Sequence, residues 1–116
     1  MVIINTSIRT TIQLVEKFSQ VDKTMQANAM LTLLYVAQYQ DRPEGITTSD
    51  IRKWLGVSNA SASRNIHLWG EGTADSSTSG FGMVEVREDP NNRTKRHVRL
   101  TPKGEAFIQQ METVYG

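Results

Sequence analysis

The residues with the clearest recognition chemistry lie in the segment 58–69. Ala62, Ile66 and Trp69 recur at helical spacing, so we expect them to form the buried face of a helix. The other residues are small, polar or basic: Asn59, Ala60, Ser61, Ser63, Arg64, Asn65 and His67. Short polar side chains around an arginine suit a helix that enters a DNA major groove and touches base edges. We therefore predict a recognition helix here.

A recognition helix needs a partner helix to position it, and the preceding residues predict one. Thr47 and Asp50 have the spacing of a capping box, with Asp in the usual Glu place. Gly56 ends this first helix, because glycine adopts the left-handed cap without steric cost. Ser58 is a favourable N-cap for the next helix, so residues 46–69 are predicted to be a helix-turn-helix. The residues near its first helix that we expect to hydrogen-bond phosphates are Thr48, Ser49 and Lys53.

A β-hairpin is predicted downstream of the recognition helix. Phe81–Arg87 and Lys95–Leu100 alternate apolar and polar residues, and Asp89–Arg93 between them has turn chemistry. If Glu85 pairs opposite Arg99, both apolar sets fall on the core side of the hairpin. These apolar residues are Val84, Val86, Val98 and Leu100.

The predicted hairpin tip is polar and basic. The tip residues expected to contact DNA are Asn91, Asn92, Arg93, Lys95 and Arg96, the last two at phosphates rather than bases. Residues 91–103 hold five Lys or Arg and no acid, and residues 51–70 hold three and no acid. The formal net charge is only +1, so the distribution of charge carries the argument. Charge alone leaves open the alternative of two solvated basic surfaces.

Three further helices are predicted around this unit. Residues 7–20 are amphipathic, and residues 25–39 are apolar on nearly every side, which predicts the central, most buried helix. The apolar residues of the first helix are Ile8, Ile12, Val15 and Phe18. A last helix over 102–115 follows Thr101 as N-cap and Pro102 as first helical residue. This order predicts one winged helix-turn-helix domain over the whole chain, mainly α with a small β-hairpin wing.

Residues 31–104 resemble the MarR family of winged helix-turn-helix regulators. The matching stretches are 46–51, 55–66, 83–85 and above all 88–104, where Arg93 follows an acidic-Pro-polar tip and the strand ends in Leu-Thr-Pro-Lys-Gly. The resemblance implies a homodimer on double-stranded DNA with a pseudo-palindromic operator. It also implies that Arg93 reaches into the minor groove. The residues that it places in the major groove are Ser61, Ser63 and Arg64.

Two features differ from the family pattern. The Gly/Ser/Thr-rich loop 70–80 is longer than the usual link between recognition helix and wing. MarR-like chains also have a longer C-terminal helix, so we expect 7–20 and 102–115 to form the dimer interface here. A small winged helix of bacteriophage or mobile-element type would have this length. The resemblance leaves a small-molecule effector open.

Other function classes find little support in the residue types. There is no cysteine, which excludes disulfides and thiolate metal sites, and His67 and His97 lack supporting ligands for a metal. We find no catalytic constellation, so we expect neither an enzyme nor a cofactor. Without a span of about 20 apolar residues or a secretory signal, the sequence predicts a cytoplasmic protein with no membrane partner. A second hypothesis is a winged-helix protein-interaction module, such as a small phage factor that binds a host or replication protein.

Overall fold

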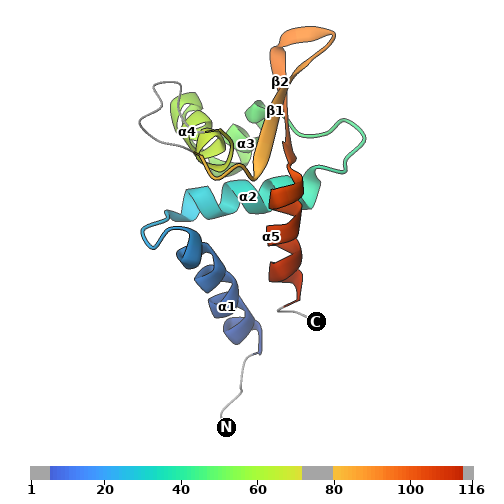
Figure 1. The fold of residues 1–116 in the computed structure, drawn as a ribbon. Helices are drawn as coiled ribbons and strands as arrows, with labels where there is room; N and C mark the ends of the chain where they lie inside the picture. Colours follow the sequence, from blue (N-terminus) through green and yellow to red (C-terminus); the bar gives the residue numbers. More distant parts are fainter. Residues whose placement is uncertain (1–5, 72–79, 114–116) are drawn as a thin grey trace.

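A helical body and a projecting β-hairpin make up the fold (Figure 1). The computed structural model describes residues 6–71 and 80–113, without the side chains of residues 6, 7 and 93. In chain order the elements are α1 (Thr6–Val21), α2 (Ala27–Tyr39), α3 (Thr48–Leu55), α4 (Asn59–Trp69), β1 (Val84–Asp89), β2 (Asn92–Leu100) and α5 (Pro102–Glu112). This order confirms the predicted winged helix-turn-helix. Within the described ranges, no helix is long and apolar enough to cross a membrane.

Helix α4 is held on α2 by Trp69, whose side chain is fully buried. Its indole N–H donates to the carbonyl oxygen of Ala29 on α2 at 2.6 Å, so the buried polar atom has a partner. Phe18 of α1 packs edge-on against Trp69 and against Phe107 of α5, with ring centroids 5.9 Å apart in both pairs. The other two residues of the predicted buried face of α4 are also buried. The prediction for that face is confirmed.

Helix α2 is central, but one side of it is exposed. The sequence makes nearly every side of this helix apolar and predicts the most buried helix, whereas Leu31 is 38% exposed. The buried residues are Ala29, Thr32, Leu33 and Val36. They face α3, α4 and β2. Leu34 and Ala37 are half-buried and line a pocket together with residues of α1 and α5, so only the side that carries Leu31 is exposed. The hydroxyl of Thr32 is satisfied locally, because it donates to the carbonyl oxygen of Asn28 at 2.7 Å.

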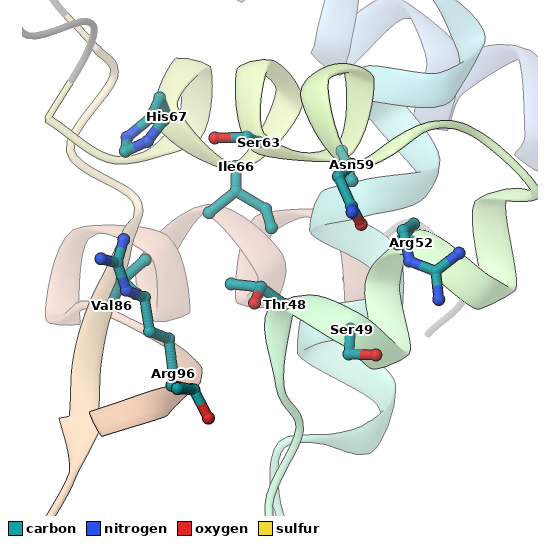
Figure 2. Close-up of a pocket in the computed structure, with 11 residues that line it drawn as sticks. Thr48, Ser49, Arg52, Asn59, Ser63, Ile66, His67, Val86 and Arg96 are labelled. Atoms are coloured by element: carbon teal, nitrogen blue, oxygen red, sulfur yellow. The ribbon is translucent and has the colours of Figure 1, made fainter. Parts of the chain in front are cut away.

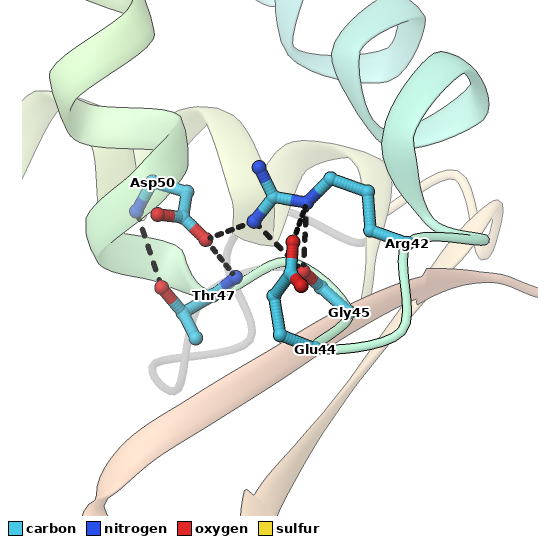
Figure 3. Close-up of polar contacts among 5 residues, drawn as sticks. All are labelled: Arg42, Glu44, Gly45, Thr47 and Asp50. Atoms are coloured by element: carbon cyan, nitrogen blue, oxygen red, sulfur yellow. Dashed lines mark hydrogen bonds and ion pairs between the residues drawn. The ribbon is translucent and has the colours of Figure 1, made fainter.

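The start of α3 is fixed by a network of short polar contacts (Figure 3). The predicted capping box is present: the Asp50 amide donates to Thr47 Oγ1 at 3.2 Å, and the Thr47 amide donates to Asp50 Oδ2 at 3.0 Å. Arg42 also donates to Asp50 Oδ2, at 3.3 Å, and to the carbonyl oxygen of Gly45, at 2.9 Å. The Arg42 guanidinium lies 5.3 Å from the ring centroid of Trp54. These contacts join the turn before α3 to the helix and fix its direction.

The hairpin has the predicted register. Glu85 pairs with Arg99, Val84 with Leu100 and Val86 with Val98. The strand bounds differ from those predicted and are 84–89 and 92–100. The core side is buried near the body, but Val86 is 36% exposed. The prediction that Val86 is part of the core is wrong, because the hairpin projects past the body and this face opens to solvent (Figure 1).

Strand β2 also connects the hairpin to the helix-turn-helix. The Val98 amide donates to the carbonyl oxygen of Ile46 at 2.9 Å, and Thr47 forms an isolated bridge with His97. The Leu100 amide donates to Gln40 Oε1 at 2.9 Å. One edge of β2 therefore pairs with β1, and the other edge holds the residues that lead into α3. The positions of the wing and of the α3 N-terminus are coupled through this strand.

The predicted loop 70–80 is closed at its base. Residues 72–79 lie outside the described residues, so its expected character is tested only at its ends. There the Phe81 amide donates to the Leu68 carbonyl at 2.9 Å, and the Met83 amide donates to the Trp69 carbonyl at 2.7 Å. The Gly82 amide donates to the Gly70 carbonyl at 2.9 Å. The chain thus leaves α4 and returns to the hairpin at nearly the same place.

A glycine in α5 is required by the close approach of that helix to the chain before β1. Gly104 is buried, and a Cβ atom there would overlap the carbonyl oxygen of Met83. We predict that Gly104→Ala lowers the free energy of unfolding by about 1–3 kcal/mol, the usual cost of overpacking. Urea unfolding would measure this. Lys103→Ala, on an exposed position of the same helix, should change it by about 0.5 kcal/mol or less, and equal effects of the two variants would contradict the packing argument.

The hairpin end is closed by an acidic side chain. Asp89 Oδ2 lies 3.0 Å from His97 Nε2, and Asp89 Oδ1 accepts the Asn91 amide at 2.8 Å. The hydrogen bond with His97, followed by that from Asn91, holds the pKa of Asp89 below its ordinary value of 3.8. The folded hairpin therefore favours the carboxylate. Its contribution to stability is present above the ordinary pKa and is lost as the pH falls through the lower folded value.

We predict that amide exchange in the hairpin becomes faster as the pH is lowered below about 4, after correction for intrinsic exchange rates. Asp89→Asn should remove this step, because its amide does not titrate, and should leave faster exchange at every pH. Hydrogen exchange followed by NMR over a pH range of about 3 to 7 would measure both. Glu88→Gln, at an exposed neighbouring position, should keep the wild-type profile; loss of the step in that variant instead would contradict the assignment to Asp89.

Candidate nucleic-acid interface

Helix α4 turns its polar side outward, as the recognition-helix prediction requires. Ser58 caps it by accepting the Ser61 amide at 3.1 Å, and Gly56 ends the preceding helix at φ 68°. Because Ala62, Ile66 and Trp69 are buried, the opposite side of α4 must face solvent. The exposed residues there are Asn59, Ala60, Ser63, Arg64 and His67, whereas Ser61 and Asn65 are half-buried at its edge.

A groove of about 600 Å³ runs between α3, α4 and the hairpin (Figure 2). Its lining residues are Thr48, Ser49, Arg52, Asn59, Ala62, Ser63, Ile66, His67, Val86, Thr94 and Arg96. Helix α4 forms one wall through positions 59, 63 and 67, which recur at four-residue steps. The first turns of α3 and the projecting face of the hairpin form the rest. The helix-turn-helix and the wing thus share one concave surface.

The structure brings only part of the predicted site into this groove. The predicted residues that line it are Thr48, Ser49, Asn59, Ser63, His67 and Arg96. The predicted residues outside the lining are Lys53, Ala60, Ser61, Arg64, Asn65, Asn91, Asn92 and Lys95. All of these lie on α3 or α4, outside the groove, or at or near the hairpin tip. The side chain of Arg93, the predicted minor-groove residue, lies outside the described part of the chain.

Two polar groove residues are missing from the sequence-based prediction, and each has a periodic signal. Arg52 follows Thr48 by four residues, so both lie on the same side of α3. However, Lys53 follows the groove residue Ser49 at the same spacing. Thr94 precedes Arg96 by two residues, so both lie on the same face of β2. The prediction names Lys53 in place of Arg52 because charge alone does not distinguish neighbouring helix positions. The direction of each side chain around α3 decides which one faces the groove.

Arg64 is exposed on the outer side of α4, away from the groove lining. Its Nη2 atom donates to Ser61 Oγ at 3.0 Å, one helical turn earlier. This contact orients the guanidinium along the helix surface and leaves its remaining N–H groups free to donate. Free donors on the outer side of a recognition helix are suited to the acceptor atoms of guanine in a major groove.

The charges along the groove have one sign. Arg52 and Arg96 line it, and no acidic residue does so among the residues that the structure describes. An adjoining cavity of about 440 Å³, toward the C-terminal end of α4, is lined instead by Glu71, Glu85 and Glu88 together with Arg87 and Arg96. The acidic residues of this region therefore line the adjoining cavity and not the groove. The groove itself suits an anionic ligand.

The recognition helix and the wing lie at the same end of the molecule (Figure 1). Helices α1 and α5 point toward the opposite end of the molecule. These two helices therefore do not obstruct the groove. The described part of the chain thus has the groove at one end and helices α1 and α5 at the other.

No protein-family model matches the sequence, and no curated protein matches it. Solved structures do match. A point mutant of S. aureus MepR bound to an oligodeoxyribonucleotide has a TM-score of 0.72 at 17% identity, covering 94% of this chain and 70% of that chain. A second match is a point mutant of E. coli MarR in complex with operator DNA, with a TM-score of 0.64 at 22% identity, covering 96% of this chain and 69% of that chain. A third is an S. aureus MepR–DNA complex, with a TM-score of 0.65 at 16% identity, covering 94% of this chain and 75% of that chain. The chain therefore has the winged helix-turn-helix fold of the MarR and MepR regulators.

Proposed function

We propose that this protein is a cytoplasmic, sequence-specific regulator of transcription that binds double-stranded DNA as a homodimer on a pseudo-palindromic operator. The observation that carries the proposal is the groove in which α3, α4 and the wing meet, with cationic and polar lining residues and no acid among those described. The three matching structures named above are complexes with DNA or an oligodeoxyribonucleotide. Phosphate contacts from such a surface would fix the orientation of α4 on the duplex.

Base recognition is assigned to the outer side of α4. Arg64 is exposed and its guanidinium can donate to the acceptor atoms of guanine, and Ser63 lies beside it on the exposed surface. Three polar residues are exposed at or near the hairpin tip: Asn91, Asn92 and Lys95. From there they can contact the DNA backbone beside the adjacent minor groove. Arg93 is proposed as the minor-groove residue of this tip. This division separates residues that read sequence from residues that add affinity.

The dimer is proposed to form through the helical end of the molecule. Ile8, Ile12 and Val15 of α1 are 58%, 54% and 42% exposed. They continue the stripe whose last member, Phe18, is fully buried. Apolar residues aligned on one helix face favour burial against a partner. We assign this face of α1, together with α5, to the contact between two copies, with half-sites about 10 bp apart or a multiple of that.

We predict that Arg64→Ala lowers the preference for the selected operator by about 1–3 kcal/mol and leaves binding to random duplex nearly unchanged. The operator would first be identified by in-vitro selection of bound duplexes. Lys95→Ala is the matched control: it should weaken operator and random duplex alike and flatten the salt dependence. Competition gel shifts would measure the ratio of operator affinity to random-duplex affinity for each variant. Wild-type selectivity in Arg64→Ala would reject the base-reading assignment.

We predict that Ile12→Glu converts the dimer to a monomer without unfolding it, because Ile12 is already exposed in the single chain and a buried charge at the interface is costly. Size-exclusion chromatography with light scattering would measure the mass. Gln13→Glu adds the same charge to a neighbouring exposed position and should leave the mass unchanged. A monomeric wild-type protein at operator-binding concentrations would contradict the proposed homodimer.

A gel shift with random duplex at low salt separates this proposal from the protein-interaction alternative. Non-specific DNA binding depends on phosphate contacts, so a DNA-binding groove should retard any duplex under these conditions. Absence of retardation would reject the DNA-binding function and favour an interaction module. The modest net charge of +1 makes low salt the right condition, since screening is then weakest.

A further inference from the structure

The arginines of this protein differ in whether their side chains form hydrogen bonds or ion pairs with other residues of the protein. Arg42 contacts Asp50 and Glu44, and Arg64 donates to Ser61. Arg87 pairs with Glu85 at 3.4 Å. The groove arginines are Arg52 and Arg96, and neither has a side-chain hydrogen bond or ion pair with any residue in 6–71 or 80–113. The same holds for Arg9 and Arg99, so it is the position in the groove that distinguishes Arg52 and Arg96.

Arg52 is half-buried, and its side chain has no hydrogen bond or ion pair within the described ranges. Its guanidinium nitrogens are not buried, so their N–H groups, which are strong donors, can still be reached from the groove. Because Arg52 lines the groove, these N–H groups can donate hydrogen bonds to a ligand bound there. The planar fork of arginine matches two oxygens of one phosphate. The site therefore suits a phosphodiester.

The two arginines lie at different ends of the groove. Figure 2 shows Arg52 near Asn59 on the α3 side, and Arg96 with His67 and Val86 on the wing side. Thr48 lies between these ends at the start of α3. Its hydroxyl is a further donor for an anion, whereas the amides of Thr47 and Asp50 are already used in the capping box. A single chain of phosphates could follow the groove and meet each end in turn.

Resting on the proposed function, we infer that Arg52 is the α3 residue that anchors DNA, and that Arg52 and Arg96 bind two different phosphates of one strand. This assignment replaces Lys53, the neighbouring cation of α3. Lys53 is exposed but does not line the groove. The contact adds affinity and fixes register, and it does not read the bases.

The matched pair Arg52→Gln and Lys53→Gln tests the first part, because each variant removes one positive charge from adjacent positions. Arg52→Gln should weaken binding to both operator and random duplex about tenfold at moderate salt, and should reduce the slope of log K against log salt by about 1. Lys53→Gln should stay within about twofold of the wild type, as expected for a screened surface charge. Arg52→Lys should recover the salt slope, which separates loss of charge from loss of folding.

Equal effects of Arg52→Gln and Lys53→Gln would overturn the assignment, since the result would then reflect only the net charge of α3. A wild-type protein that binds duplex DNA and an Arg52→Gln variant with unchanged affinity would overturn this inference but leave the proposed function intact. A wild-type protein that retards no duplex would overturn both. Circular dichroism of each variant would verify that the helices are present.

Phosphate ethylation interference tests the second part on the selected operator. With wild-type protein, ethylation should interfere at two or more phosphates of the same strand in each half-site. Arg52→Gln should lose interference at one of them, and Arg96→Gln should lose it at another on that strand. Loss at the same phosphate in both variants, or on opposite strands, would overturn the one-strand path.

Discussion

The orientation of the recognition helix depends on the burial of Trp69. This side chain lies against Phe18 and Phe107, and its N–H donates to the Ala29 carbonyl oxygen on α2. A buried aromatic ring with one directed hydrogen bond permits little rotation of the helix that carries it. Because that face of α4 points inward, the polar residues on the opposite side must point outward. The proposed base contacts are therefore a consequence of core packing.

Strand β2 provides the second constraint, because it connects two parts of the groove. Its edge toward Ile46 leads directly into the capping box of α3, while its other edge pairs with β1. Moving the wing would therefore strain the start of α3. Arg42 strengthens this connection through Asp50 and the carbonyl oxygen of Gly45. The walls of the groove are thus positioned relative to one another before any ligand binds, which reduces the entropic cost of binding.

Features set by near neighbours in the chain could be predicted from the sequence. The capping box of Thr47 and Asp50 and the register around Glu85 and Arg99 are both confirmed, because local spacing determines them. Burial was harder to predict, since it depends on what packs against a residue. Val86 has the pattern of a core residue but stands on the projecting part of the hairpin. Leu31 likewise belongs to an apolar helix but lies on its uncovered side.

In the candidate site, too, features set by local spacing could be predicted from the sequence, and features set by packing could not. The outer side of α4 can be predicted from the sequence, because three buried residues at helical spacing define the opposite side. The sequence does not show which α3 cation faces the groove, since that depends on the rotation of α3 against α4 and the wing. Arg52 and Thr94 are recovered only when periodicity on α3 and β2 is combined with the position of the groove between them. The residue pattern of α3 and that of β2 do not by themselves show that these two elements line the same groove.

The backbone ladder between residues 68–70 and 81–83 has a practical consequence for evolution and engineering. It closes the chain on itself before the wing begins, and Thr101 reinforces the closure by donating to the carbonyl oxygens of Gly82 and Met83. The ends of the connection between α4 and β1 are therefore fixed close together by bonds outside the groove. In general, each doubling of the length of a flexible loop costs only about 0.6 kcal/mol in loop-closure entropy. An insertion between positions 71 and 80 is therefore expected to leave the ladder, and the groove that begins beyond it, in place.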